Sequence, residues 1–235
     1  MAEIQIKHYN KIVFFTGAGL SAESGIPTYR GKGGVWQEYN YEDFACQRAF
    51  DKDPQKVWEF HNKRREFING CQPNEGHRII AAVEQTKPQT MVITQNIDGM
   101  HQRAGSKKVI ELHGSLWRVR CDREGTISEN TDIPLKSMKC DCGEYLRPDI
   151  VWFEDPLDQQ KIQQAVEAIF QSDLFVSIGT SGVVFPAAQL PAVAIQNSVP
   201  TVEINIESTP LSQLYQYRLQ GPASEMLKQL CSDSD

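Results

Sequence analysis

One histidine of this sequence stands where an active site is expected. His113 follows a short apolar run, Val109–Leu112, and precedes Gly114. If that run is a buried parallel strand, the histidine lies at the carboxyl edge of the sheet, where ligands bind in open α/β folds. An imidazole titrates near neutral pH and can act as the general base for a hydroxyl. A structural hydrogen bond is the commoner role of a lone histidine, so the residue by itself leaves both interpretations open.

Two polar residues follow another apolar run, Thr90–Thr94. Asn96 and Asp98 come directly after it. An amide and a carboxylate together offer the donor and the acceptors that hold an amide ligand rigidly. Asp98 could instead cap the turn formed by residues 98–103. The pair is therefore a second candidate for ligand binding.

A glycine-rich turn follows the first apolar run, Ile12–Thr16. It reads Gly17-Ala18-Gly19-Leu20-Ser21-Ala22, the G-x-G-x-x-A pattern of dinucleotide-binding turns. The first glycine permits a tight turn, the second lets the backbone approach a pyrophosphate, and Ala22 permits close packing of helix on strand. Backbone N–H groups at the helix start would then face the phosphates. A plain strand-to-helix turn, with its glycines at positive φ, is the alternative.

The acidic residue that binds the ribose in dehydrogenases is missing from its usual place. It should end a second strand about 20 residues after the glycine turn. The chain instead enters a polar stretch that begins at Tyr29-Arg30-Gly31. Asn205 and Glu207, after the run Thr201–Asn205, could bind ribose hydroxyls or simply form a solvated strand end. A nucleotide held in this way need not be a hydride carrier.

The elements that must position these residues alternate between strands and helices. The predicted strands are Ile12–Thr16, Thr90–Thr94, Val109–Leu112, Leu174–Ile178 and Thr201–Asn205. Such near-continuous apolar runs suit a parallel sheet that is buried on both faces. The predicted helices between them are Glu75–Gln85 with Asn74 as N-cap, Lys161–Phe170, and Phe185–Gln196, which Pro191 kinks or shortens. The alternation predicts an α/β fold with a Rossmann-like, doubly wound parallel sheet.

Two insertions predict a smaller domain over the carboxyl edge of this sheet. Residues 32–70 contain a helix candidate, Pro54–Ile68, and residues 117–148 are polar and rich in turns. We expect the Rossmann-like domain to consist of residues 1–31, 71–116 and 149–235.

Composition limits the function. The chain has 235 residues, a formal net charge of -6 and no block of Lys and Arg beyond short pairs, which argues against a nucleic-acid surface. The apolar run near the N-terminus is too short for a signal peptide or a membrane span, so we expect a cytoplasmic protein without a membrane partner. The six cysteines do not form the dense framework of a small secreted domain, and we expect them to be reduced.

Five motifs in order carry a family resemblance. They are GAGLSAESGIPTYR (residues 17–30), TQNIDGMHQRAG (residues 94–105), Leu112-His113-Gly114, Gly179-Thr180-Ser181 and Gly221-Pro222-Ala223-Ser224. This set resembles the sirtuin family of NAD-dependent protein-lysine deacylases over nearly the whole chain. In detail it is most similar to the branch that removes succinyl and malonyl groups.

The resemblance implies a mechanism in which NAD is a co-substrate. The acyl-lysine carbonyl oxygen attacks the nicotinamide ribose carbon, and His113 then takes a proton from a ribose hydroxyl, which attacks the acyl carbon. The products are free lysine, nicotinamide and O-acyl-ADP-ribose. Tyr29 and Arg30 belong, by resemblance, to a loop that closes over the cofactor. The residues assigned to the cofactor in this way are Gly17, Ala18, Gly19, Glu23, Thr28, Tyr29, Arg30, Gln95, Asn96, Ile97, Asp98, Gly179, Thr180, Ser181, Asn205, Ile206, Glu207 and Ala223.

The resemblance also implies a site for an acylated-lysine protein or peptide. Arg64 matches the arginine of a Tyr-x-x-Arg pair that binds the acyl carboxylate, but His61 stands in the tyrosine position. Arg64 could equally be a solvated helix residue. Tyr41 replaces a small residue and either narrows the acyl pocket or supplies a phenol. Val151-Trp152-Phe153 resembles the strand to which the peptide adds by backbone pairing, with a buried apolar strand as the alternative.

The zinc ribbon of the family is altered. Sirtuins carry two Cys-x-x-Cys pairs, whereas this chain has Cys121 followed by Glu124, and Cys140-Asp141-Cys142. Three thiolates and Glu124 could bind zinc, but adjacent Cys-x-Cys ligation is awkward. We expect a degenerate zinc-ribbon-like module without stoichiometric zinc.

Other functions fit parts of the pattern. An ADP-ribosyltransferase would use the same NAD site, but Arg64 and the peptide strand favour deacylation. A non-catalytic NAD or ADP-ribose-binding module would be expected to lack His113 or Asn96, and both are present. We expect a monomeric NAD-dependent protein-lysine deacylase.

Overall fold

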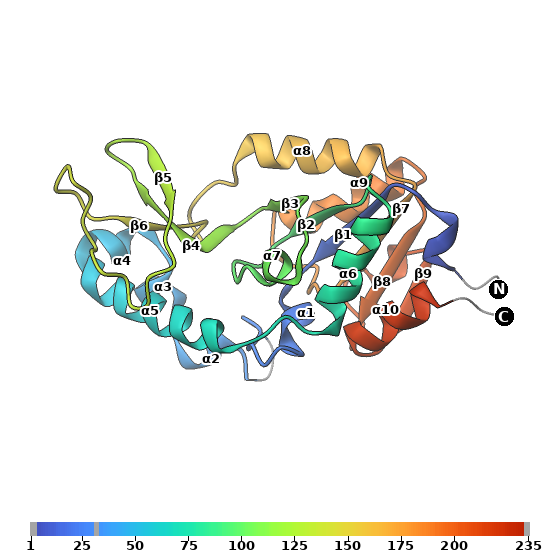
Figure 1. Cartoon of the computed structure of the whole chain (residues 1–235), viewed down its shortest axis with the longest axis horizontal. Coiled ribbons are helices and arrows are strands. Elements are labelled where there is room, and N and C mark those ends of the chain that lie inside the picture. The colour runs from blue at the N-terminus through green and yellow to red at the C-terminus, as the bar shows by residue number, and fades with distance from the viewer. Residues whose placement is uncertain (1–3, 31–32, 233–235) are drawn as a thin grey trace.

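Two sheets make up the framework of the molecule. The computed structural model describes residues 4–30 and 33–232. In the larger sheet six parallel strands lie in the order β3-β2-β1-β7-β8-β9, and a three-stranded antiparallel sheet lies beside it along the long axis (Figure 1). The parallel strands are β1 (Ile12–Thr16), β2 (Met91–Thr94), β3 (Val109–Glu111), β7 (Leu174–Ile178), β8 (Thr201–Asn205) and β9 (Tyr217–Gln220).

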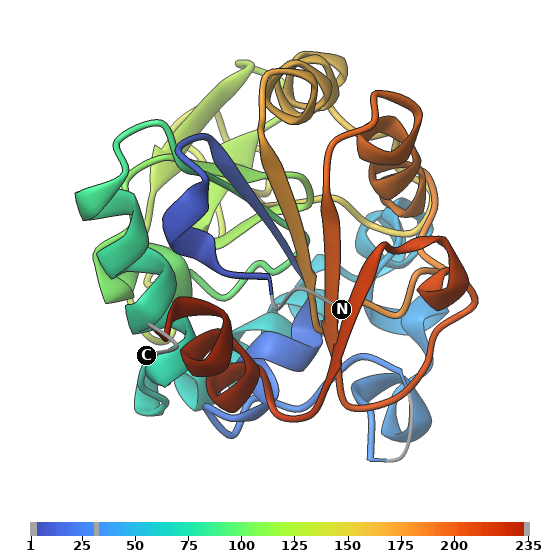
Figure 2. The same cartoon turned by 90° about the vertical axis from the view of Figure 1, so that its right-hand side faces the viewer.

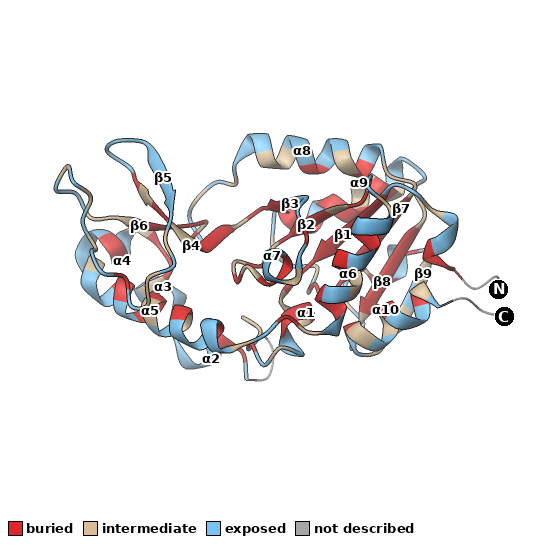
Figure 3. Cartoon of the chain, viewed as in Figure 1, coloured by how far each residue is buried: buried red, intermediate tan, exposed pale blue. Residues whose placement is uncertain are grey.

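Both faces of the parallel sheet are covered by helices, as the apolar strand runs predict. Helices α6 (Glu75–Thr86) and α10 (Ala223–Cys231) cover one face, and α8 (Gln159–Phe170) and α9 (Leu190–Gln196) cover the other (Figure 2). Alternate residues of β1 enter the two cores, Ile12 and Phe14 on one side and Val13 and Phe15 on the other. Buried residues therefore line the strands and the inner sides of the helices (Figure 3). The predicted doubly wound α/β fold is confirmed.

The smaller unit combines the antiparallel sheet with helices. The sheet has the order β5-β4-β6, with β4 at Gly114–Cys121, β5 at Thr126–Glu129 and β6 at Arg147–Ile150. The helices are α2 (Val35–Glu38), α3 (Tyr41–Phe44), α4 (Gln47–Lys52) and α5 (Pro54–Gly70). Trp58, Leu116 and Trp152 join the two parts in one apolar core. Residues 31 and 32, where the helical insertion was expected to begin, lie outside the described residues.

Short elements complete the chain. Helices α1 (Ala18–Ala22) and α7 (Met100–Ala104) follow β1 and β2, and 3-10 turns occupy Ile6–His8, Ala187–Gln189 and Ser212–Leu214. None of the helices within residues 4–30 and 33–232 is long and apolar enough to span a bilayer.

The predicted elements agree with the structure where apolar periodicity and caps coincide. The five predicted strands are present within one residue at each end. The side chain of Asn74 accepts a hydrogen bond from the backbone N–H of His77 and caps α6 as predicted. Asp53 caps α5 in the same manner by accepting from the N–H of Lys56.

In the second half of the chain one prediction is wrong, one helix is shortened at Pro191 as the sequence allowed, and one strand was missed. The helix predicted at residues 185–196 is a 3-10 turn followed by α9, because Pro191 lacks an N–H and is tolerated only in the first turn of a helix. Residues 151–153 form no strand, since β6 ends at Ile150. Strand β9 was missed because it is an edge strand whose side chains alternate between intermediate and exposed positions.

Candidate active site

The carboxyl ends of the parallel strands bring the sequence motifs into one row. The strand order reverses between β1 and β7, the point at which folds of this kind bind nucleotides. Adjacent strands lie about 4.8 Å apart, so the row extends for about 24 Å and suits an extended ligand. In spatial order the row contains His113 after β3, Asn96 and Asp98 after β2, Gly17–Gly19 after β1, Gly179–Ser181 after β7, Asn205–Glu207 after β8 and Gly221–Ala223 after β9.

The glycines at the centre of the row let two loops pack backbone against backbone. The N–H of Gly19 donates to the carbonyl of Gly179 at 2.9 Å, and a Cβ on Gly17 or Gly19 would come within 2.7 Å of Gly179 atoms. Gly17 has a φ of -126°, so the expected tight turn is not the reason for this glycine. Ala22 is exposed, and its predicted packing against the strand is wrong.

A shallow hollow lies beside the ends of β1 and β2. Polar and apolar side chains line it together, and the polar ones come from three separate segments of the chain. The lining residues are Ala18, Ser21, Ile26, Pro27, Tyr29, Arg64, Asn96, Ile97 and Asp98.

Asn96 and Asp98 are held in this hollow by Ser21. The Asn96 amide donates to the carbonyl of Gly17 at 3.0 Å and to the Ser21 hydroxyl at 3.1 Å. The Ser21 hydroxyl donates to Asp98 at 2.7 Å, and the N–H of Met100 donates to the other carboxylate oxygen at 2.9 Å. Burial raises the pKa of Asp98, although these bonds act in the opposite direction. The site thus holds a rigid amide next to a carboxylate, as the recognition of a carboxamide requires.

His113 is oriented as a base. Its Nδ1 lies 2.9 Å from the carbonyl oxygen of Gln95, the neighbour of Asn96 in the chain. A carbonyl oxygen only accepts, so Nδ1 carries the proton and Nε2 keeps its lone pair. Burial lowers the pKa of His113, and the charge of Arg30 lowers it further. The ring is therefore neutral at pH 7 and able to take a proton.

Tyr29 and Arg64 close the hollow on the side of the smaller unit. The Arg64 guanidinium donates to the Tyr29 hydroxyl at 3.1 Å and lies 4.9 Å from the centre of its ring. Burial raises the pKa of Tyr29, which stays a neutral phenol. Thr28 donates to the carbonyl of Arg30 at 2.8 Å and fixes the turn of this segment. Arg64 is thus part of the hollow rather than a solvated helix residue.

A second shallow hollow lies at the far end of the row. Its lining residues are Glu203, Asn205, Glu207, Ser208, Arg218, Leu219 and Gln220. The Asn205 amide donates to the carbonyl of Thr180 at 2.8 Å and ties the loop after β7 to the loop after β8. Ile206 and Ser181 are exposed there. The predicted residues 179–181 and 205–207 therefore lie together.

Glu23 and Ala223 lie where the end of α1 meets the start of α10. The Glu23 carboxylate accepts from the N–H and the hydroxyl of Ser224, so the end of α1 is bonded to the start of α10. Ala223 is buried at that helix start.

The residues predicted for substrate binding divide into an exposed and a buried group. The rings of Tyr41 and Phe153 are partly exposed and pack with their centres 4.3 Å apart. His61 is buried, contacts the carbonyl oxygen of Phe44 at 3.2 Å and stacks on Trp152. Burial lowers the pKa of His61 to about 3, so it carries no charge.

The backbone N–H groups of residues 151–153 are already hydrogen-bonded within the protein. In chain order they donate to His113, Asp155 and Ala45, at 2.9 to 3.1 Å. The carbonyl of Trp152 also accepts from the N–H of Asp155 at 3.1 Å. A peptide that pairs with this segment must therefore use the carbonyl groups of Val151 and Phe153 or displace these bonds.

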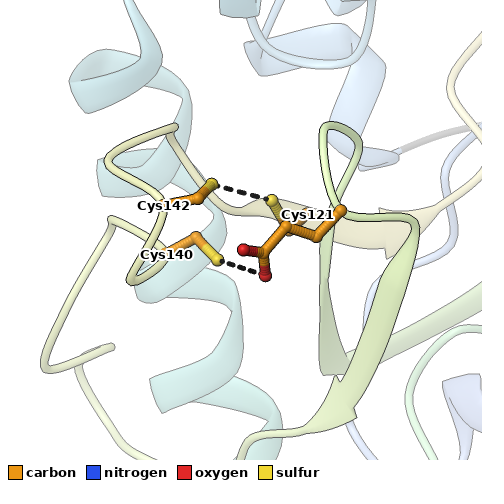
Figure 4. Close-up of side chains that lie close together, drawn as sticks. Cys121, Cys140 and Cys142 are labelled. Atoms are coloured by element: carbon orange, nitrogen blue, oxygen red, sulfur yellow. Dashed lines mark hydrogen bonds between the residues drawn. The ribbon is translucent and has the colours of Figure 1, made fainter.

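The altered cysteine set converges on one point (Figure 4). The ligand atoms of Cys121, Glu124, Cys140 and Cys142 all lie within 4.8 Å of one another, and two of the contacts are 3.3 and 3.5 Å long. Tetrahedral zinc with Zn–S and Zn–O bonds near 2.3 and 2.1 Å requires separations of about 3.6 to 3.8 Å. The chain turns tightly after Cys142, where Gly143 has a φ of 91° and its N–H donates to the carbonyl of Cys140 at 2.9 Å. The four residues fit a zinc ion better than the sequence indicated.

Two residues of the site were missed by sequence reasoning. Ser21 connects Asn96 to Asp98, and its place within the glycine motif was the available signal. Trp117 donates from its indole nitrogen to the carbonyl of Asp98 at 2.7 Å, and no pattern in the sequence marks it.

The strand order, the row of loops and the rigid amide site define a nucleotide-binding α/β protein with a neutral histidine at one end of its site. Comparison with known proteins gives the family. Residues 17–186 match the Sir2 family model. The chain belongs to the Sir2 family.

Close relatives cover the chain almost completely. The NAD-dependent protein deacylase of Aquifex aeolicus is 46% identical, with 93% of each chain covered. NAD-dependent protein deacylase 2 of Pyrobaculum aerophilum is 45% identical over 94% of this chain and 90% of its own. A solved Sir2 homologue in complex with ADP-ribose is 42% identical, has a TM-score of 0.91 and covers 96% of this chain and 92% of its own.

Proposed function

We propose that this protein is an NAD-dependent protein-lysine deacylase that produces free lysine, nicotinamide and O-acyl-ADP-ribose. The observation that carries the proposal is the tautomer of His113. Its Nδ1–H donates to the carbonyl of Gln95, which leaves Nε2 with a lone pair. His113 follows β3, the strand at one end of the row. A neutral imidazole in this orientation can take the proton of a ribose hydroxyl.

The other residues bind and orient. Asn96 and Asp98 contact the nicotinamide carboxamide, and the hollow at Asn205 and Glu207 holds the distal ribose. The loops at Gly17–Gly19 and Gly179–Ser181 lie between them, next to the phosphates. Tyr29 and Arg30 shield the site from water. The row of loops, the two hollows and the rigid amide support these assignments.

The substrate is an acylated lysine within a protein or peptide. A Sir2 protein whose structure contains a deacetylated peptide and 3′-O-acetyl ADP-ribose is 31% identical and has a TM-score of 0.86. Tyr41 and Phe153 offer an aromatic surface for the acyl-lysine chain, and the carbonyl groups of Val151 and Phe153 pair with the peptide. Arg64 binds the carboxylate of a succinyl or malonyl group, since its only hydrogen bond within the described residues goes to Tyr29.

Product analysis tests the proposal. Acetyl-, succinyl- and malonyl-lysine peptides are incubated with NAD, and the products are measured by mass spectrometry. We expect the free-lysine peptide and O-acyl-ADP-ribose in equal amounts, with turnover lost in His113→Ala and kept in the control His8→Gln, which changes an exposed histidine. Peptide that gains the mass of ADP-ribose would instead identify an ADP-ribosyltransferase, and unchanged turnover in His113→Ala would refute the role of the base.

We further propose that the protein is a monomer, acts in the cytoplasm and binds no nucleic acid. The net charge of -6 supports the last of these. Sedimentation at micromolar concentration, with and without duplex DNA, tests the oligomeric state and the absence of nucleic-acid binding.

A further inference from the structure

The chain on either side of His113 passes from one sheet to the other. Glu111 is the last residue of β3 in the parallel sheet, and Gly114 is the first residue of β4 in the antiparallel sheet. His113 therefore lies in the connection, and its position depends on how the two sheets are held at this point.

The backbone ladder is interrupted at the same place. Strand β4 pairs with β6 at Gly114–Ile150 and again at Val119–Pro148. Four residues of β4 thus stand opposite the single residue Asp149. No regular strand pairing fixes this part of β4 against β6.

The side chain of Arg118 fills the interruption. Its Nε donates to Asp149 at 2.8 Å and its terminal nitrogen donates to Glu111 at 2.6 Å, so one guanidinium joins β4, β6 and β3. The side chains of Arg118, Asp149 and Glu111 are only 20%, 12% and 9% exposed, so removal of one partner would leave a largely buried charge unpaired. Gln102 of α7 donates to the second oxygen of Glu111 at 2.8 Å and fixes that carboxylate from the other side.

Backbone contacts also hold the segment that contains His113. The N–H of Val151 donates to the carbonyl of His113 at 2.9 Å. Gly114 has a φ of 77°, and a Cβ there would come within 2.0 Å of the carbonyl oxygen of Asp149. The backbone of β6 thus contacts the connection directly, and the side chain of Asp149 bonds to Arg118.

We propose that Arg118, bonded to Glu111 and Asp149, is a positioning residue that sets the orientation of the His113 ring. The bridge fixes the chain at Glu111, two residues before His113, and at Asp149, one residue before Ile150, the strand partner of Gly114. Without it, the connection can move relative to the Gln95 carbonyl, and Nδ1 loses the bond that selects the base tautomer. The proposal rests on His113 as the base of the proposed function.

The test uses Arg118→Met and the matched control Arg120→Met. Arg120 lies two residues further along β4 and pairs with Asp122 at 2.8 Å, with no contact to β3. We expect Arg118→Met to lower kcat on an acetyl-lysine peptide by about 100-fold, because a displacement of about 1 Å has an effect of this size. The Kd for NAD should change less than about threefold, and Arg120→Met should keep near wild-type kcat.

Nitrogen NMR of the His113 imidazole separates positioning from loss of structure. We expect a protonated Nδ1 in the wild type and in Arg120→Met, and a mixture of tautomers in Arg118→Met, with Arg118→Lys intermediate in both kcat and spectrum. If Arg118→Met does not fold, Glu111→Gln, which keeps the acceptor oxygen but removes the charge, should show the same changes to a smaller extent.

Two results would overturn the proposal. One is an unchanged imidazole spectrum in a folded bridge variant, and the other is a loss of kcat that merely follows the loss of NAD binding. The spectrum tests the bridge even if the wild type turns over no acyl-lysine peptide, so failure of the proposed function is distinguishable from failure of this inference.

Discussion

At the scale of single residues, burial decides which side chains can exchange protons. His61, His77 and His101 are buried and have lowered pKa values, and each has one hydrogen-bonded ring nitrogen and one buried nitrogen without a partner. His113 differs because its ring is half-buried, whereas the unpaired ring nitrogens of the other three are enclosed by protein. Among the histidines that the structure describes, it is the one placed to act as a base at the nucleotide row.

The pH dependence of turnover should report this environment. Because burial and Arg30 lower the pKa of His113, the ring stays neutral below the ordinary value of 6.5. Activity should therefore be constant near pH 7 and fall only as the pH drops through the lowered pKa. The acid limb of kcat/KM, measured from pH 4.5 to 8 and compared with the NMR titration of His113, checks this. A limb with its midpoint above 6.5 would contradict it.

Replacing Arg64 should separate two roles of its guanidinium. If its free edge binds an acyl carboxylate, Arg64→Met should reduce kcat/KM for succinyl-lysine peptide by about 10-fold or more relative to acetyl-lysine peptide, since a charged hydrogen bond contributes about 1.5 to 3 kcal/mol. Lys63→Met, which changes an exposed neighbour on α5, is the control. Equal losses on both peptides would mean that Arg64 acts only by holding Tyr29.

At the scale of elements, close backbone contact organises the centre of the site. Gly179 has a φ of 61°, and a Cβ there would approach the N–H of Leu20 to 2.5 Å. Gly125, in the turn between β4 and β5, has a similar φ of 64° but open space around it.

The two glycines form a matched pair for mutation. Gly125→Ala should cost about 1 kcal/mol, the penalty of left-handed backbone for a residue with a Cβ. Gly179→Ala should cost about 2 kcal/mol more because backbone atoms must move apart. It should also weaken NAD binding, whereas Gly125→Ala should not. Urea unfolding and titration calorimetry measure both effects. Equal destabilisation by the two substitutions would show that the contact is unimportant.

The cysteine set predicts a metal ion in the smaller unit. Since the four ligand atoms converge within 4.8 Å, we expect the purified protein to hold one equivalent of zinc by elemental analysis. Glu124→Gln should weaken zinc binding, whereas Glu129→Gln, on the exposed strand β5, should not. A chelator should lower the melting temperature of the wild type. Protein isolated without zinc would support the degenerate module that the spacing of the cysteines favoured.

At the scale of the whole molecule, buried histidines couple stability to pH. Burial lowers the pKa of His77 to about 4, so the folded state binds fewer protons than the unfolded chain. The free energy of unfolding is therefore highest above pH 6.5, where the ring is neutral in both states. It decreases as the pH falls from 6.5 towards 4, because only the unfolded chain then binds the proton.

His77→Gln should therefore reduce the loss of stability on acidification. Between pH 7 and pH 5 the wild type should lose about 2 kcal/mol through this residue, from 1.36 kcal/mol per pH unit below 6.5. Urea unfolding at the two pH values measures the difference, and His8→Gln is the exposed control. An equal pH dependence of the wild type and His77→Gln would contradict the assignment.

The sequence by itself determined the parallel sheet and the order of its motifs. The apolar runs at Ile12–Thr16 and Leu174–Ile178 can only be buried on both faces, and the cap at Asn74 starts α6 through a local hydrogen bond. Because parallel strands share one carboxyl edge, this pattern also placed His113, Asn96 and Asn205 at the same edge.

Only the tertiary structure decided how those residues act. The tautomer of His113 depends on a carbonyl 18 residues away, and Ser21 reaches Asp98 across 77 residues. The bridge of Arg118 and the convergence of Glu124 with three cysteines likewise join segments distant in the chain. Such contacts depend on side-chain directions and sheet register. Periodicity and spacing, which are local properties, carry no information about them.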